Sequence, residues 1–294
     1  MSTTETASSR YATLEDWSTG DLVAGILEGQ FYAIGAVQGA SRELAQAIDL
    51  ASERLAAGGR LVYMGAGTSG RISTQDAAEL TPTFNWPAER AVSLMAGGAG
   101  AFTRAKEGAE DDEVAAVADL DGISVSANDV VIGVAASGRT PYVIAGLAHA
   151  RKIGALTIGI YNNRGGRVGE ACELPILIET GPEILAGSTR MKAGTAQKAA
   201  LNCISTGVMI RLGFVYRGKM VEMLPTNAKL RERGALMVAD LTGEALETAT
   251  RAFNDAGQSV KLAVVMLSLG KNRAEAEAAL AAVGGNLRKA LTAA

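Results

Sequence analysis

Five short apolar runs recur along this chain, with helical patterns between them. They occupy residues 61–64, 91–95, 130–134, 156–160 and 174–178. Runs of this length suit buried strands and are too short to span a membrane. Buried strands that alternate with helices form a parallel sheet that is covered by helices on both faces. The sequence therefore predicts an α/β fold built on a doubly wound parallel sheet flanked by helices.

Polar, glycine-bearing loops follow two of these runs directly. Residues 65–71 read Gly-Ala-Gly-Thr-Ser-Gly-Arg, and residues 135–141 read Ala-Ala-Ser-Gly-Arg-Thr-Pro. A third loop, residues 187–195, reads Gly-Ser-Thr-Arg-Met-Lys-Ala-Gly-Thr and precedes a long helical pattern. Glycines let N–H groups approach an anion, hydroxyls donate hydrogen bonds, and a following helix directs its positive end at the charge. Ligands of such sheets bind beyond the strands' carboxyl ends, so the loops predict one phosphorylated ligand there.

Each loop by itself could be an ordinary strand-to-helix turn, because Gly, Ser and Thr are common in turns and caps. Three such loops together favour ligand binding. The first loop is also a weak match to a dinucleotide fingerprint, but the acidic residue expected about twenty residues later is not clearly placed. The chain has no Walker-type Gly-Lys-Ser/Thr, which argues against a nucleoside triphosphatase.

The length of 294 residues suits one large domain and one small one. Residues 1–20 read as a mobile or loosely packed N-terminal arm, and residues 21–239 hold the predicted sheet. Residues 240–294 predict a compact three-helix domain, in which glycines break an alanine-rich pattern. This last part shows no candidate chemistry, so a packing or dimer-supporting role is favoured over a separate binding module.

Composition excludes several classes of partner. A net charge of −3 gives no general attraction to nucleic acid or to an anionic membrane surface, and aromatic content is only 4%. No secretory signal is visible at the N-terminus. Cys172 and Cys203 stand in apolar surroundings without metal-ligand spacing, so buried thiols and a reducing cytoplasm are expected.

Acid–base chemistry is expected from carboxylates. The single histidine, His149, has a helical context and is interpreted as a helix-surface residue. Glu79 lies in the helix that the first loop opens, and Pro82 is expected to end that helix at Thr81. A negative charge is disfavoured at a helix C-terminus, which suits a general acid. Glu110 belongs to an acidic cluster that, on chemistry alone, is more typical of a solvated helix end.

These motifs, in this order, resemble N-acetylmuramic acid 6-phosphate etherases over roughly residues 20–294. The resemblance rests on residues 65–71, 76–79, 82–84, 107–111, 136–141, 187–195 and 226–230. It implies a flavodoxin-like domain of the sugar-isomerase (SIS) type and a small C-terminal helical domain. It also implies cleavage of the D-lactyl ether of N-acetylmuramate 6-phosphate, giving N-acetylglucosamine 6-phosphate and D-lactate in cell-wall recycling. The chain departs from the family's pattern at residues 80–81, 85–86 and 99, which bears on fine substrate preference.

The resemblance assigns roles to residues. Glu79 matches the family's proton donor and Glu110 its second catalytic acid, which we assign as the base that removes the C2 proton. No metal or organic cofactor is expected, and the SIS-type fold with its apolar N-terminal helix implies a homodimer. The residues expected to bind the substrate and its phosphate are Gly67, Thr68, Ser69, Arg71, Ser137, Gly138, Arg139, Thr140, Ser188, Thr189, Arg190, Lys192 and Thr195.

Two other functions fit the same fold. A phosphosugar isomerase would also open the sugar ring and move the C2 proton. A non-catalytic sugar-phosphate sensor would need the loops but no acids, so Glu79 and Glu110 together disfavour it.

Overall fold

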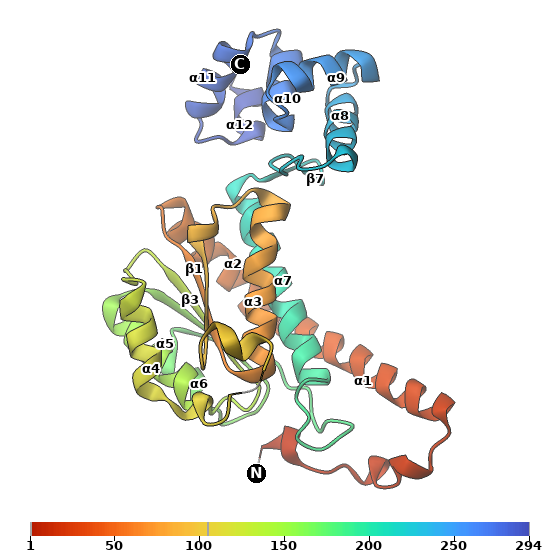
Figure 1. Ribbon diagram of the computed structural model, residues 1–294, viewed down its shortest axis with the longest axis vertical. Coiled ribbons are helices and arrows are strands. Elements are labelled where there is room, and N and C mark those ends of the chain that lie inside the picture. The colour runs from red at the N-terminus through yellow and green to blue at the C-terminus, as the bar shows by residue number, and fades with distance from the viewer. Residues whose placement is uncertain (1, 105, 294) are drawn as a thin grey trace. The chain divides into compact units, whose positions relative to one another are not determined.

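The computed structural model describes residues 2–104 and 106–293 and divides into two compact units (Figure 1). The first, called here the sheet unit, holds residues up to 78 together with 88–207. The second, the C-terminal unit, holds residues 79–87 and those from 208 onward. The C-terminal unit thus begins well before residue 240, because α8 (Ala228–Thr242) packs on the helices that follow it.

The sheet unit is built on five parallel strands in the order β2-β1-β3-β4-β5. Their bounds are β1 (Leu61–Gly65), β2 (Ala91–Met95), β3 (Val130–Ala135), β4 (Leu156–Tyr161) and β5 (Leu174–Leu177). All five predicted runs are confirmed as strands, and the doubly wound parallel sheet is confirmed with them. This order is the flavodoxin-like one, with its topological switch point between β1 and β3. The loops after those two strands therefore flank the place where such sheets bind ligands.

Helices cover both faces of the sheet, as expected (Figure 1). Alternate strand residues, such as Val62 and Val131, share one core with Leu120 and Leu147 from two helices. Tyr63 points to the opposite face, where its hydroxyl meets Asp76. Figure 1 shows α1 (Thr19–Gly39) extending away from the sheet. The other helices that begin in this unit are α2 (Ser41–Ala56), α3 (Gly67–Phe84), α4 (Glu113–Gly122), α5 (Pro141–Ile153), α6 (Val168–Ala171) and α7 (Lys192–Leu212).

The first described residues are held by hydrogen bonds and burial and are not loosely packed. Residues 2–18 form short 3₁₀ turns, and Thr4 is fully buried. The backbone N–H of Thr4 donates to Asn163 Oδ1 at 3.1 Å, and its carbonyl accepts from the N–H of Gly187 at 2.8 Å. The start of the arm thus forms hydrogen bonds with polar groups of two loops, at Asn163 and Gly187. The polar sequence of residues 1–20 did not indicate these contacts.

The helix α3 continues past the predicted stop at Thr81 and ends at Phe84, so Pro82 lies inside it. Proline removes one intrahelical hydrogen bond. The last turn is nevertheless closed, since Asn85 N donates to Thr81 O at 2.9 Å and Thr81 Oγ1 donates to Trp86 O at 2.9 Å. Burial of Phe84 and Trp86 offsets the lost bond.

The C-terminal unit contains a two-stranded hairpin, β6 (Val215–Tyr216) and β7 (Lys219–Met220), followed by helices. Among the described residues beyond α8 there are four helices rather than the predicted three. Gly257, Gly270 and Gly284 each adopt a left-handed conformation, and one of them lies in each connection between these helices. The four helices are α9 (Leu246–Asp255), α10 (Val260–Leu269), α11 (Arg273–Ala281) and α12 (Leu287–Thr292).

The two thiols differ in environment. Cys172 is buried, and burial raises its pKa to about 11. Cys203 is exposed on α7, so the prediction of a buried thiol is wrong there. Within residues 2–104 and 106–293, none of the helices combines the length and apolar character that crossing a membrane requires.

Candidate active site

One chain of buried hydrogen bonds connects the first two predicted loops to α7, the helix that begins within the third. Ser69 Oγ donates to Gln197 Oε1 at 2.9 Å, and Gln197 Nε2 donates to Asn162 Oδ1 at 2.9 Å. The backbone N–H of Asn162 then donates to Ala136 O in the second loop at 3.1 Å. Ser69, Asn162 and Gln197 are all buried. The structure therefore brings the first loop, the second loop and the start of α7 together at the carboxyl end of the sheet.

The first loop opens α3 with Gly67 in a left-handed conformation. A side chain at Gly65 would lie 2.7 Å from the backbone nitrogen of Gly70, so the turn excludes any larger residue there. The first N–H groups of α3 have no intrahelical partner, which leaves them available to an anion. The hydroxyl hydrogen of Ser69 is already donated to Gln197, so Ser69 can offer a ligand its backbone N–H but not its hydroxyl hydrogen.

The second loop keeps a hydroxyl hydrogen available. Ser137 is half-buried, and its Oγ accepts from the backbone N–H of Arg139 at 3.1 Å. Gly138 has φ +68°, and a side chain there would lie 2.8 Å from Gly166 Cα, so only glycine fits. Thr140 precedes α5, and its hydroxyl makes no capping bond. Ser137 and Thr140 can therefore donate to a ligand, while Arg139 is exposed.

The start of α7 is occupied by a carboxylate of the protein itself. Glu183 is fully buried and accepts from the backbone N–H groups of Lys192 and Ala193, both at 2.9 Å. The N–H of Gly194 donates to Thr189 O at 2.9 Å. These N–H groups already have acceptors within the protein, so that α7 directs its positive end at the ligand stays a prediction that these bonds do not favour. Glu183 lies nine residues before α7, outside any local capping motif.

The polar side chains of the third loop face different neighbours. Ser188 and Thr189 are half-buried, and Arg190 is exposed. Thr195 Oγ1 donates to Gln30 on α1. Lys192 is nearly buried, and its Nζ lies 5.2 Å from the centroid of the Tyr32 ring. Burial lowers the pKa of Lys192, an effect that the charge of Glu183 opposes.

Glu110 lies beside the first loop. It belongs to a single 3₁₀ turn, Ala109–Asp111, and lines a cleft of about 150 Å³ together with Gly67 and Arg71. The Arg71 guanidinium donates to the carbonyls of Phe102 and Ala101, at 2.9 and 3.0 Å. Arg71 thus holds the turn Ala99–Phe102 beside the cleft, and two of its five N–H hydrogens are taken by those carbonyls.

Glu79 is exposed and belongs to the C-terminal unit. Its pairing with Glu110 therefore stays a prediction. One turn earlier on α3, the buried Asp76 accepts hydrogen bonds from Tyr63 at 2.9 Å, Asn202 at 2.7 Å and Ser205 at 3.2 Å. Burial raises the pKa of Asp76, although these hydrogen bonds oppose the change. Asp76 anchors α3 to β1 and α7, and its place in Asp-Ala-Ala-Glu was the only signal of that role.

The sequence analysis also considered a histidine and a metal site. His149 lies on α5, partly exposed, with Nε2 at 2.8 Å from Asp121 Oδ1. Among the residues that the structure describes, no three His, Cys, Asp or Glu side chains are grouped so that they could hold a metal ion.

Glu183→Gln tests the internal cap of α7. An amide oxygen can accept from one of the two N–H groups, but its NH₂ must then face the other donor. We expect the free energy of unfolding to fall by about 2–3 kcal/mol, measured by urea denaturation. The matched control is Glu179→Gln, which removes an exposed ion pair with Arg164 and should change stability little. Equal losses in the two variants would contradict the role of Glu183.

Comparison with known proteins shows the family of the chain. Two family models match the chain: the glucokinase regulatory protein N-terminal SIS domain over residues 43–151, and the SIS domain over residues 115–206. An N-acetylmuramic acid 6-phosphate etherase of Deinococcus radiodurans is 48% identical over 98% of this chain and 94% of that protein. The chain belongs to the N-acetylmuramic acid 6-phosphate etherase family. A second etherase, from Mycolicibacterium smegmatis, is 44% identical over 98% of this chain and 97% of that protein. The resemblance drawn from the motifs is thereby confirmed.

Proposed function

We propose that this protein is a carbon–oxygen lyase that acts on N-acetylmuramate 6-phosphate. It cleaves the D-lactyl ether to give N-acetylglucosamine 6-phosphate and D-lactate, a step in the recycling of cell-wall sugars. The observation that carries the proposal is the joining of the first two hydroxyl-bearing loops to α7 by Ser69, Gln197 and Asn162, with Glu110 in the cleft beside the first loop. Family membership supports the choice of substrate.

The chemistry follows from the substrate. An ether oxygen is a poor leaving group, but this one is on C3, β to the C1 aldehyde of the open-chain sugar. The C2 proton is acidic in that form, so elimination across C2–C3 is accessible. Glu110 takes the C2 proton, the C3–O bond breaks, and Glu79 protonates the departing lactate oxygen. Water then adds its oxygen to C3 while C2 receives a proton.

The phosphate gives the binding energy that positions the reacting carbons. Its donors are the first N–H groups of α3 and the hydroxyls of Thr68, Ser137 and Ser188, each of which lies half-buried. The sequence also predicted the N-terminus of α7 as a donor to the phosphate. We leave it out of this proposal because Glu183 already accepts from the N–H groups there. Arg139 and Arg190 are exposed and add positive charge at the same loops.

Incubation with N-acetylmuramate 6-phosphate and an assay for D-lactate tests the function. A phosphosugar isomerase would release no lactate and would convert an aldose phosphate to a ketose phosphate. A sensor would bind the sugar phosphate without turning it over. Binding without lactate release at micromolar enzyme would therefore overturn the proposal.

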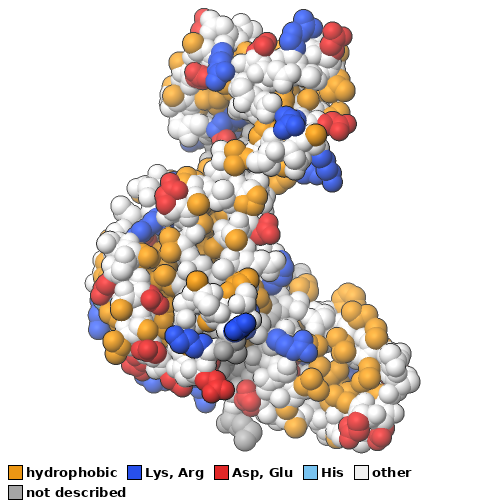
Figure 2. Space-filling model, in the orientation of Figure 1, with side chains coloured by type: hydrophobic (Ala, Val, Ile, Leu, Met, Phe, Trp, Pro, Cys, Tyr) orange, Lys and Arg blue, Asp and Glu red, His pale blue; other side chains and the backbone are white. Residues whose placement is uncertain are grey.

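We also propose that the protein works as a homodimer in the cytoplasm. Four apolar side chains of α1 lie on one stripe and are half or more exposed: Val23, Leu27, Phe31 and Ile34. Figure 2 shows hydrophobic side chains gathered over this helix. Such a patch is costly in water and suits a symmetric contact with a second copy. The two free thiols suit a reducing compartment.

The dimer can be tested by sedimentation at micromolar concentration. We expect the wild-type protein to sediment as a dimer, and Leu27→Glu with Phe31→Glu to give a monomer, because charges on both copies would face each other. Leu246→Glu is the matched control, since Leu246 is a similarly exposed apolar residue on α9. A wild-type monomer with full activity would contradict this proposal.

A further inference from the structure

The cleft beside the first loop holds a lysine that the proposed reaction does not yet use. Lys106 lines this cleft of about 150 Å³ together with Arg71, Glu107 and Glu110. Lys106 and Glu110 are both exposed, so a substrate can reach them. The volume is below the usual range of small-molecule pockets, so the cleft can enclose only part of a sugar phosphate.

Gly97 makes room for Lys106 next to the turn that carries Glu110. Its φ of +87° favours glycine, and a side chain there would begin 3.0 Å from Cδ of Lys106 and 3.2 Å from Cβ of Ala109. The aliphatic part of Lys106 therefore packs over Gly97, as does the turn Ala109–Asp111. Lys106 and the proposed base are thereby held close together in the cleft.

Lys106 is the cation of this cleft that is best placed to bind an anion. The Arg71 guanidinium already donates to the carbonyls of Phe102 and Ala101. Among the described residues, Lys106 takes part in none of the ion pairs. Glu110 must be ionised to remove a proton, so an anionic group of the substrate beside it would be repelled unless a cation offset that charge.

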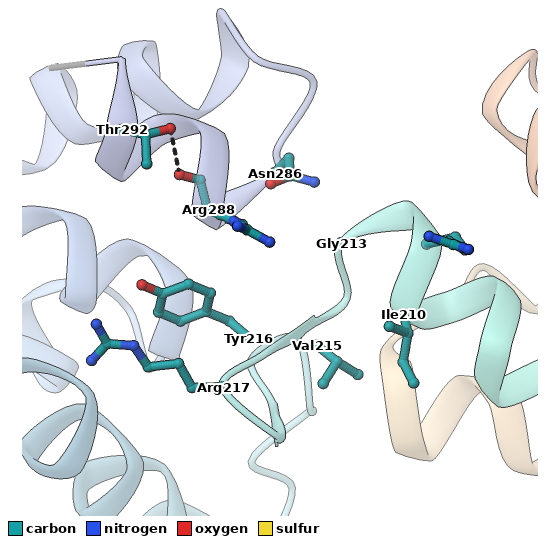
Figure 3. A pocket seen from close by; sticks show the side chains of 9 residues that line it. Ile210, Gly213, Val215, Tyr216, Arg217, Asn286, Arg288 and Thr292 are labelled. Atoms are coloured by element: carbon teal, nitrogen blue, oxygen red, sulfur yellow. Dashed lines mark hydrogen bonds between the residues drawn. The ribbon is translucent and has the colours of Figure 1, made fainter.

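Cations also line a cavity of about 690 Å³ in the C-terminal unit, but they do not converge there. Figure 3 shows Arg217 and Arg288 on opposite sides of the Tyr216 ring. The guanidinium carbon of Arg217 lies 5.4 Å from the centroid of that ring. This cavity therefore offers a small anion no common point, in contrast to the cleft in which Lys106 and Glu110 share one glycine.

The substrate of the proposed reaction brings a second anion to the cleft. Its lactyl carboxylate is separated from C2 only by C3, the ether oxygen and one lactyl carbon, so the carboxyl carbon lies within about 5 Å of C2. A base that reaches the C2 proton is therefore close to this carboxylate as well. The phosphate, in contrast, is on C6 and is bound by the loops.

We propose that Lys106 binds the lactyl carboxylate and so selects sugars whose ether substituent is an acid. This role rests on the proposed function and adds a specificity-determining residue to it. The ammonium group donates a charge-assisted hydrogen bond to the carboxylate and offsets its repulsion from Glu110. It also holds the departing lactate while the C3–O bond breaks.

Steady-state kinetics with two substrates tests this role. One is N-acetylmuramate 6-phosphate, and the other is its analogue in which a carboxamide replaces the lactyl carboxylate. Formation of N-acetylglucosamine 6-phosphate measures the turnover of both. The wild type is expected to prefer the acid in kcat/KM by roughly tenfold to a hundredfold, the usual effect of a hydrogen bond between charged groups.

Variants of Lys106 should change this preference in a defined way. In Lys106→Met the ratio of kcat/KM for acid over amide should fall to near one, with the activity on the amide nearly unchanged. Lys106→Arg keeps the charge and should retain most of the preference. An equal ratio in the wild type and Lys106→Met would overturn the proposal, including the case in which the variant loses activity on both substrates alike.

Two further comparisons separate this role from other effects. Lys152→Met removes an exposed lysine near the end of α5 that does not line the cleft, and it should keep the wild-type ratio. A fall of the ratio in Lys152→Met as well would show a nonspecific effect of net charge and overturn the role of Lys106. No product from either sugar with the wild type would refute the proposed function itself, and the role of Lys106 with it.

Discussion

Glu110→Gln is expected to lower kcat for lactate release by about 10²–10⁴-fold, the usual contribution of a positioned general base. The amide keeps the size of the side chain in the cleft beside Gly67 but cannot take a proton. Exchange of the C2 proton with deuterated water should be lost together with lactate release, because both require deprotonation at C2. Glu113→Gln is the matched control, since Glu113 is an exposed acid of the same cluster at the first residue of α4 and does not line the cleft.

Glu79→Gln is expected to behave differently from Glu110→Gln. It should depress lactate release but can retain slow C2 exchange, because deprotonation does not strictly need the acid that protonates the leaving group. Full exchange in Glu110→Gln together with none in Glu79→Gln would reverse the assignment of acid and base.

Isotopes in the wild-type reaction decide which bond breaks. Elimination breaks the C3–O bond, so lactate keeps its ether oxygen and the new oxygen at C3 comes from water. Reaction in oxygen-18 water should therefore label the amino sugar at C3 and leave lactate unlabelled. Oxygen-18 in the lactate hydroxyl would mean that water attacked the lactyl carbon, which would rule the elimination out.

Unphosphorylated N-acetylmuramate is expected to be a very poor substrate. Losing a pair of charge-assisted hydrogen bonds costs about 3–6 kcal/mol, which corresponds to roughly 10²–10⁴-fold in kcat/KM. Steady-state kinetics with both sugars measures the ratio directly. Comparable turnover of the two sugars would contradict the proposal that the loops bind the phosphate.

Substitutions of loop residues test whether the preference for the phosphorylated sugar arises from the loops. Ser137→Ala should lower kcat/KM for the phosphorylated sugar and leave the poor activity on the unphosphorylated one nearly unchanged, because the lost donor acts only on the phosphate. Ser268→Ala, an exposed serine on α10, is the control and should change neither. Ser69→Ala should also reduce stability, since it breaks the hydrogen bond to Gln197 that links the first loop to α7.

Much of the fold and part of the candidate site follow from local sequence. Short apolar runs such as residues 130–134 predict strands, and glycines predict the turns of the first two loops. Both features can be predicted because they depend on residues that are close together in the sequence. The prediction that α3 stops at Thr81 failed because buried aromatic residues beyond Pro82 outweigh one missing hydrogen bond.

The sequence by itself determined the parallel sheet, the order of the motifs and the residue types that a phosphate and an elimination require. The tertiary structure decided which of those groups remain available. Glu183, nine residues before α7 in the sequence, accepts hydrogen bonds from the N–H groups at the start of that helix. Gln197, far from Ser69 in the sequence, accepts the hydroxyl hydrogen of Ser69. Each donor hydrogen makes one strong bond, and a buried donor takes the partner that the fold places next to it, whatever its distance along the chain.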